Sequence, residues 1–191
     1  MNNDHVLYDD FLKISNNWPL DDWSITKECF DNIIAVLPFG KTILEIGSGN
    51  STRLLSKFYS MISIESNPEW MNRYESKYYL VPIKPMISEI FGPTEWLDID
   101  KIRDILTEID YDLLLVDAGG DRVGIYDNIA LFKTDVPIIF DDTMDEGYLK
   151  CATLIADKYN KQCTTVQCAV NVHAVCWFNG KRYSIITGRP R

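Results

Sequence analysis

The stretch TILEIGSGNSTRLL, at residues 42–55, constrains the fold more than any other part of the chain. It predicts a short buried strand over residues 43–46 that breaks at Gly47 and Gly49, followed by a helix that Ser51 caps. Glycines let the backbone turn tightly and approach a ligand, and the N–H groups at a helix start favour polar or anionic groups. We therefore expect a nucleotide-type cofactor to bind at this turn.

Two cofactor classes use such a turn, and the residues around the glycines distinguish them. A dinucleotide pocket prefers the pattern G-x-G-x-x-G, but Thr52 stands at the third glycine position. Glu45 lies two positions before the first glycine, where a carboxylate is unfavourable beside a pyrophosphate and favourable beside a cationic ligand. S-adenosylmethionine carries both a sulfonium and an amino group, so the turn favours this cofactor over a nicotinamide dinucleotide.

Acidic residues also end three other expected strands. Glu65 ends the apolar stretch MISIE, Asp117 ends YDLLLVD, and the pair Asp141 and Asp142 ends VPIIFDD. In doubly wound sheets the ligand binds outside the carboxyl ends of the strands, so these side chains are expected near the glycine turn. Glu65 is expected to accept hydrogen bonds from two ribose hydroxyls, a role shared by S-adenosylmethionine and NAD sites.

The order of the expected elements defines an α/β fold. The expected helices cover residues 24–37, 52–59, 68–78, 94–109, 126–132 and 146–159. Short apolar strands alternate with them, and Pro82 and Pro85 place the third strand near a sheet edge. Asn179-Gly180 predicts a hairpin between the last two strands. We expect a three-layer α/β/α sandwich with a Rossmann-like, mostly parallel sheet that ends in an antiparallel hairpin.

Length and charge limit the organisation and the partners. The 191 residues fit one domain over residues 24–191, preceded by a segment over residues 1–23 that acts as a packing arm or a lid. The net charge of −9 disfavours a nucleic-acid-binding surface, which relies on clustered Lys and Arg. No apolar run approaches membrane-spanning length, and the first residues do not resemble a signal peptide. We expect a soluble cytoplasmic protein whose five scattered cysteines are reduced.

Four segments together resemble a known family. In chain order they are LEIGSGNST, ISIESNPEW, DLLLVDAGGDR and IIFDDT. Their order and spacing resemble small class I S-adenosylmethionine-dependent methyltransferases, a group similar in layout to catechol-type O-methyltransferases. The resemblance covers roughly residues 24–160, most of one domain by usual domain size. It implies a seven-stranded sheet with S-adenosylmethionine across the carboxyl ends of its strands.

The resemblance also assigns roles to individual residues. Glu45 and the two glycines would line the methionine end of the cofactor, Glu65 would hold the ribose, and Ser66 would contact the adenine side. The residues expected to bind the cofactor are Glu45, Gly47, Ser48, Gly49, Asn50, Ser51, Glu65, Ser66 and Asp117. Asp117 would lie beside the methyl donor, where the acceptor enters. Ala118 and Gly119 replace a glycine and a proline that often follow this aspartate in similar sequences.

Asp117, Asp141 and Asp142 form a second set of candidates. Metal-dependent catechol-type enzymes use an aspartate and an Asp-Asn pair at these positions, and Mg²⁺ prefers such oxygen ligands. This chain has Asp-Asp instead, so the three carboxylates either hold Mg²⁺ or supply a general base through Asp117 or Asp141. The alternative is that Asp141 caps a turn and Asp142 is solvated. Arg122 either binds an acidic acceptor or pairs with Asp121.

The leading interpretation is an S-adenosylmethionine-dependent methyltransferase that acts on a small-molecule acceptor, at oxygen. One alternative is a nicotinamide-dependent oxidoreductase on the same sheet, which Thr52 and Glu45 disfavour. A second is a non-catalytic module that keeps the cofactor pocket without an acceptor site. The sequence leaves the acceptor and the oligomeric state open, a homodimer included.

Overall fold

This computed structural model describes residues 4–16, 24–117, 120–167 and 182–188. The helices are α1 (Asp4–Asn16), α2 (Lys27–Val36), α3 (Asn50–Leu55), α4 (Ile99–Glu108), α5 (Ile125–Asn128) and α6 (Glu146–Lys158). Three short 3₁₀ turns are η1 (Pro68–Trp70), η2 (Arg122–Gly124) and η3 (Ile129–Leu131). The strands are β1 (Thr42–Ile46), β2 (Ser60–Glu65), β3 (Lys77–Leu80), β4 (Ile83–Ser88), β5 (Gly92–Leu97), β6 (Leu113–Val116), β7 (Ile138–Phe140), β8 (Gln162–Gln167) and β9 (Arg182–Thr187).

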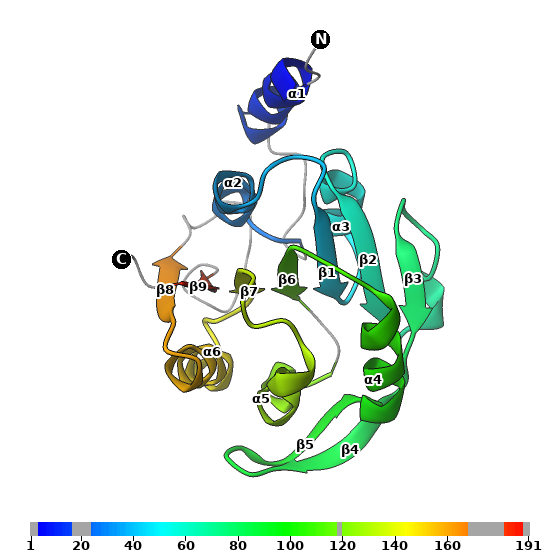
Figure 1. Ribbon diagram of the computed structural model, residues 1–191, viewed down its shortest axis with the longest axis vertical. Coiled ribbons are helices and arrows are strands. Elements are labelled where there is room, and N and C mark those ends of the chain that lie inside the picture. Colours follow the sequence, from blue (N-terminus) through cyan, green and yellow to red (C-terminus); the bar gives the residue numbers. More distant parts are fainter. Residues whose placement is uncertain (1–3, 17–23, 118–119, 168–181, 189–191) are drawn as a thin grey trace, which may run out of the picture.

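Seven strands form one sheet in the order β3-β2-β1-β6-β7-β9-β8 (Figure 1). Neighbouring strands from β3 to β7 are parallel, whereas β9 runs antiparallel to both β7 and β8. From β1 the chain adds β2 and β3 on one side, and then returns to add β6 and β7 on the other side. In folds of this type, ligands bind in the crevice at such a switch point, outside the carboxyl ends of the strands. The observed architecture confirms the expected α/β fold, including the antiparallel pair at its C-terminal end.

Helices cover both faces of the sheet and give it two apolar layers (Figure 1). Alternate strand residues, such as Ile43 and Leu113, pack with Phe30 of α2 and Leu55 of α3 on one face. Their neighbours in the strands pack against α4, α5 and α6 on the other face. The central strand β6 is buried at every position, as a parallel strand covered on both faces must be. Among the described residues, no helix has the length and apolar character needed to cross a membrane.

The segment expected as one helix over residues 94–109 is instead a strand followed by a helix. β5 pairs antiparallel with β4 in a separate two-stranded sheet, which lies beyond α4 and α5 at the base of Figure 1. Asp98 then begins α4, because its side chain accepts a hydrogen bond from the Asp100 N–H at 3.3 Å. Trp96 and Ile99 fit a helical spacing, and this pattern concealed the boundary between them.

Other local predictions were wrong in whole or in part. Thr26, and not Ser24, caps α2 through a hydrogen bond from the Cys29 N–H at 3.2 Å. The stretch expected as a helix over residues 68–78 contains η1 and the start of β3 instead, and α3 ends at Leu55. The stretch expected as a third strand at a sheet edge forms two strands: β3 does end the seven-stranded sheet, but Pro85 lies in β4 of the separate two-stranded sheet. The predicted turn at Asn179-Gly180 lies outside the described residues.

Candidate functional site

The carboxyl ends of four parallel strands bring the predicted site residues to one edge of the sheet. The Gly47 N–H donates to the carbonyl of Ile64 at 2.8 Å, which joins the glycine turn to the end of β2. The Asp117 N–H donates to the carbonyl of Ile46 at 3.1 Å. The Asp141 N–H donates to the carbonyl of Val116, the last residue of β6, at 3.0 Å. The acidic strand ends therefore lie side by side at this edge, near the glycine turn as expected.

The glycine turn has the backbone geometry that a ligand-binding loop needs. Gly47 has a φ of 90°, a left-handed conformation that side chains rarely adopt. A Cβ added to Gly49 would meet nothing within 4 Å, so the space above this residue is open. Ser51 is not the N-cap: its buried hydroxyl accepts a hydrogen bond from the Ile25 N–H at 3.0 Å. Gly49 occupies the cap position, and Thr52 supports it by accepting the Gly49 N–H at 3.0 Å.

Glu45 lies beneath this turn and is 1% exposed. Its Oε1 accepts hydrogen bonds from the hydroxyls of Thr52, at 2.8 Å, and Ser63. Burial raises the pKa of Glu45 to about 8, although the two hydroxyls lower it, and the nearby Asp117 and Glu65 raise it further. The carboxyl group is therefore largely protonated at neutral pH, and it joins β1, β2 and α3 in one polar network.

Glu65 ends β2 with both of its carboxylate oxygens in hydrogen bonds. Oε2 accepts from the Ser48 N–H at 2.9 Å and from the Ser48 hydroxyl at 2.8 Å. Oε1 accepts from the N–H groups of Ser66 and Asn67, both at 2.8 Å. A carboxylate offers about four acceptor positions, so the protein fills them all. Three of these donors are backbone groups, and only the Ser48 hydroxyl can rotate away.

The remaining residues of the predicted cofactor set surround the same turn. Asn50 begins α3, and its side-chain oxygen accepts a hydrogen bond from the Tyr74 hydroxyl at 2.8 Å. Sequence reasoning did not identify Tyr74, or Ser63 as the partner of Glu45. The strand register contains that second signal, because Glu45 and Ser63 are direct partners in the β1–β2 pair. A polar residue opposite a buried carboxylate predicts such a contact.

Asp117, Asp141 and Asp142 meet where β6 and β7 end. Each offers a carboxylate oxygen within 4.8 Å of the others. Asp141 is 2% exposed. Asp142 has a φ of 55°, a left-handed conformation that Asp tolerates better than most residues. The structure thus brings together the three residues that were predicted to bind a metal or to supply a general base.

Arg122 lies against this cluster, and sequence reasoning left its partner open. Its Nη1 donates to Asp142 Oδ2 at 2.8 Å, and its Nη2 lies 3.4 Å from Asp117 Oδ1 and donates to the Asp117 carbonyl. Burial alone disfavours the guanidinium charge, but the facing carboxylates of Asp117 and Asp142 outweigh it and raise the pKa of Arg122. Arg122 therefore pairs with two predicted metal ligands, and no ion pair with Asp121 is formed.

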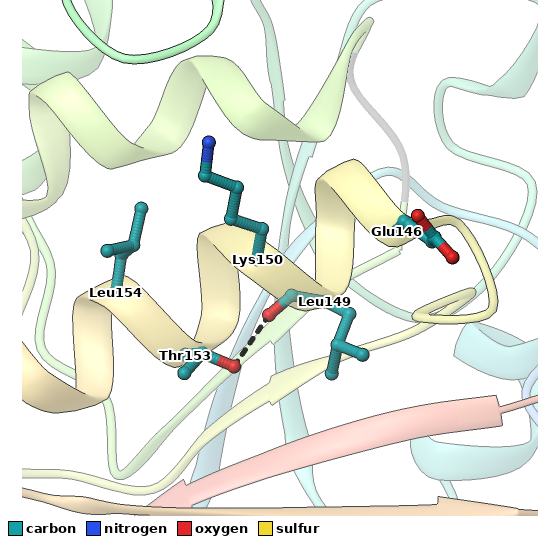
Figure 2. A pocket seen from close by; sticks show the side chains of 5 residues that line it. All are labelled: Glu146, Leu149, Lys150, Thr153 and Leu154. Carbon is teal, nitrogen blue, oxygen red and sulfur yellow. Dashed lines mark hydrogen bonds between the residues drawn. The ribbon is translucent and has the colours of Figure 1, made fainter.

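A shallow hollow on the outer face of α6 provides no comparable set of groups (Figure 2). Five residues of this one helix line it, namely Glu146, Leu149, Lys150, Thr153 and Leu154. The Thr153 hydroxyl donates to the Leu149 carbonyl of its own helix at 2.9 Å. Charged and polar groups from several elements converge instead at the strand ends, so that edge is the candidate site.

Solved structures with the same fold include two methyltransferases and one other enzyme. The precorrin-6Y C5,15-methyltransferase of Geobacter metallireducens GS-15 is 13% identical with a TM-score of 0.55, covering 89% of this chain and 93% of that one. The methyltransferase domain of bacterial CtHen1-CN is 11% identical with a TM-score of 0.51, covering 84% and 96%. Spermidine synthase of Thermotoga maritima is 12% identical with a TM-score of 0.50, covering 78% and 53%.

These similarities establish the fold, which is that of the class I methyltransferases. No protein-family model matches the sequence, and no curated protein sequence is detectably similar to it. A spermidine synthase has this fold as well, so the reaction must be argued from the residues of the site.

Proposed function

We propose that this protein is an S-adenosylmethionine-dependent methyltransferase that methylates an oxygen of a small-molecule acceptor. The observation that carries the proposal is the position of Glu65. Its carboxylate ends β2, faces the glycine turn, and is held there by hydrogen bonds from Ser48, Ser66 and Asn67. A fixed carboxylate at this edge is suited to accept a hydrogen bond from a ribose hydroxyl that takes the place of the Ser48 hydroxyl.

The surrounding residues fit the same cofactor. The space above Gly49 is open, so a ligand can lie directly on the backbone there. Glu65 and Asp117 both lie near Glu45 at this edge, and the negative potential of these two carboxylates, without a contribution from the protonated Glu45, favours a sulfonium and an ammonium group. Ser48 would release its hydroxyl hydrogen bond so that a ribose hydroxyl can bind Glu65. A pyrophosphate, in contrast, would be repelled by the same carboxylates.

When bound, S-adenosylmethionine supplies an electrophilic methyl group and leaves as the neutral sulfide S-adenosylhomocysteine. The chain itself contributes alignment and proton removal. Asp117 and Asp141 end adjacent strands beside the cofactor edge, where an acceptor hydroxyl would lie between them and the methyl donor. One of these carboxylates would accept the hydroxyl proton as the new C–O bond forms. Holding acceptor and donor in line would supply most of the acceleration.

Calorimetric titration with S-adenosylhomocysteine tests the cofactor assignment. We expect wild-type protein to bind, and Glu65→Ala to bind about ten- to a hundredfold more weakly, because hydrogen bonds to a charged group are lost. Glu69→Ala is the matched control, since Glu69 is exposed on η1 a few residues away. An unfolding curve for each variant shows whether the turn remains folded.

Other outcomes would select a different function. Absence of heat with wild-type protein, together with NADH quenching of tryptophan fluorescence, would replace the proposal with the oxidoreductase alternative. Binding without turnover on a broad panel of hydroxylated acceptors would support a non-catalytic cofactor-binding module. Turnover that yields an N-methylated product would keep the enzyme class and overturn the choice of oxygen.

A further inference from the structure

Arg122 lies against the cluster of Asp117, Asp141 and Asp142, where the sequence predicts a divalent metal ion. Two nitrogens of Arg122 face Asp117 and Asp142, at 3.4 and 2.8 Å from their carboxylate oxygens. The side chains of this group are 10%, 22% and 31% exposed for Arg122, Asp117 and Asp142. Two of the three carboxylates that could chelate a divalent cation are therefore already paired with a charge from within the chain.

The guanidinium is held in this position from several sides. Its central carbon lies 5.2 Å from the centroid of the Tyr148 ring, within range of a cation–π contact. Asp121 caps the η2 turn and accepts a hydrogen bond from the Thr94 hydroxyl of β5 at 2.7 Å. A Cβ on Gly124 would lie 2.6 Å from the Cβ of Trp96, so the turn packs too closely on β5 for any larger residue. Arg122 is thus fixed by its own element and by the β4–β5 hairpin.

The backbone of Asp142 is also adapted to this contact. Its φ of 55° is a conformation that costs energy for a residue other than glycine. Its carboxylate accepts a hydrogen bond from Arg122 Nη1 at 2.8 Å, a shorter distance than the 3.4 Å between Arg122 Nη2 and Asp117 Oδ1. The strained backbone conformation and the ion pair with Arg122 therefore occur at the same residue, Asp142.

We propose that Arg122 is the resident cation of this carboxylate cluster, and that it occupies the place a divalent metal ion would take. A guanidinium is always charged and presents a planar fork that matches carboxylates, so it can satisfy two of them at once. Mg²⁺ would have to lose water and displace a buried arginine. Arg122 is then a positioning residue that holds Asp117, and methyl transfer at this site requires no metal; this last step alone rests on the proposed function.

Manganese binding followed by electron paramagnetic resonance tests the resident cation, with Mn²⁺ as the probe. We expect wild type and Arg122→Lys to bind Mn²⁺ weakly, and Arg122→Ala to bind it about a hundredfold more tightly, since a unit charge beside three carboxylates has been removed. Adding Asp142→Asn to the Arg122→Ala variant should abolish this gain in Mn²⁺ affinity. Arg103→Ala is the matched control, because Arg103 is an exposed arginine paired with Asp100.

Two results would overturn the proposal. One is tight Mn²⁺ binding by the wild-type protein that is lost in Asp142→Asn. This test does not depend on whether Arg122→Ala folds. The other is a folded Arg122→Ala that gains no Mn²⁺ affinity. The metal-free reaction has its own readout: turnover by wild type should be unchanged by EDTA, and a loss restored by Mg²⁺ would contradict it. S-adenosylhomocysteine binding tests the proposed function separately, so the two failures remain distinguishable.

Discussion

Two groups of carboxylates lie at the same edge of the sheet, and the protein stabilises them differently. Around the glycine turn, Glu65 is satisfied by backbone N–H groups and one hydroxyl, while Glu45 is buried against two hydroxyls. At the ends of β6 and β7, Asp117 and Asp142 are instead paired with the Arg122 guanidinium. The proposed cofactor end thus uses neutral donors, and the proposed acceptor end uses a formal positive charge.

The kind of partner that each group of carboxylates has determines which ligand groups can replace that partner. A hydroxyl donor can be replaced by a ligand hydroxyl at little cost, because one hydrogen bond substitutes for another. A buried charge can be replaced only by another cation, because leaving the carboxylates unpaired is costly. The cofactor end is therefore suited to bind and release a neutral sugar, whereas the acceptor end is suited to stay fixed. The predictions below test this contrast, from the largest expected effect to the smallest.

Removal of the guanidinium should have the largest effect on stability. We expect Arg122→Ala to lower the free energy of unfolding by about 3–5 kcal/mol, because it leaves buried carboxylates without their partner. Urea denaturation measures this loss, and Arg103→Ala should change stability by less than about 1 kcal/mol, as is usual for an exposed pair. Equal effects of the two substitutions would show that the acceptor end is not stabilised by charge.

The protonated Glu45 at the proposed cofactor end should make the stability of the protein depend on pH. The pKa of Glu45 is raised to about 8 in the folded protein from an ordinary value of 4.5, so the folded state holds a proton that the unfolded state releases between these values. Stability from this group is fully present below pH 4.5 and is lost as the pH rises through 8. Glu45→Gln should therefore gain about 3–4 kcal/mol over wild type between pH 5 and pH 8.

Urea denaturation at the two pH values checks this gain. Glu95→Gln is the matched control, since Glu95 is exposed, and its difference from wild type should stay constant with pH. A Glu45→Gln variant whose stability follows wild type at both pH values would show that Glu45 is ionised in the folded protein. The contrast between a neutral and a charged end would then be lost.

Two glycines allow the ends to be separated by equivalent substitutions. Gly124→Ala should lower stability by about 1–3 kcal/mol, because the new Cβ would overlap Trp96. Gly49→Ala should cost only about 0.5 kcal/mol, since its φ of −174° suits any residue and the space around it is open. The same Gly49→Ala change should weaken S-adenosylhomocysteine binding, as the methyl group takes the space of the ligand. Thermal unfolding and calorimetry together measure both; unimpaired binding by Gly49→Ala would remove this turn from the site.

The smallest expected effect has the opposite sign. Ser48→Ala removes the one side-chain hydroxyl bound to Glu65, so a ribose hydroxyl no longer has to displace it. We expect S-adenosylhomocysteine to bind about three- to tenfold more tightly, corresponding to about 1 kcal/mol. Calorimetry beside Ser66→Ala provides the comparison, because Ser66 contacts Glu65 only through its backbone N–H. Weaker binding by Ser48→Ala would indicate that its hydroxyl contacts the ligand directly.

The fold and the acidic strand ends were predictable because their signals are local. Three of the parallel strands, β2, β6 and β7, are short apolar runs with an acidic residue at or directly after the last position, and this pattern locates Glu65 and Asp117 without any knowledge of packing. The β4–β5 hairpin was missed because Trp96 is buried against η2, which lies far along the chain, and not on the inner face of a helix of its own. Apolar spacing alone cannot separate those two causes of burial.

The partner of Arg122 could not be predicted for a related reason. Asp121 is its neighbour in the sequence, whereas Asp142 is twenty positions away and lies nearby only because β6 and β7 are adjacent. The left-handed backbone of Asp142 also has no signature in the sequence. The prediction of a metal site correctly identified three clustered carboxylates, but the charge that faces them depends on tertiary structure.

The β4–β5 hairpin has a consequence for how such a protein can evolve. It pairs with no strand of the seven-stranded sheet, so its length and sequence can change without disturbing the register of that sheet. Its residues Thr94 and Trp96 nevertheless support the turn that carries Arg122. Mutations in this hairpin are therefore expected to shift the proposed acceptor end by small steps, while the strand register of the seven-stranded sheet is kept.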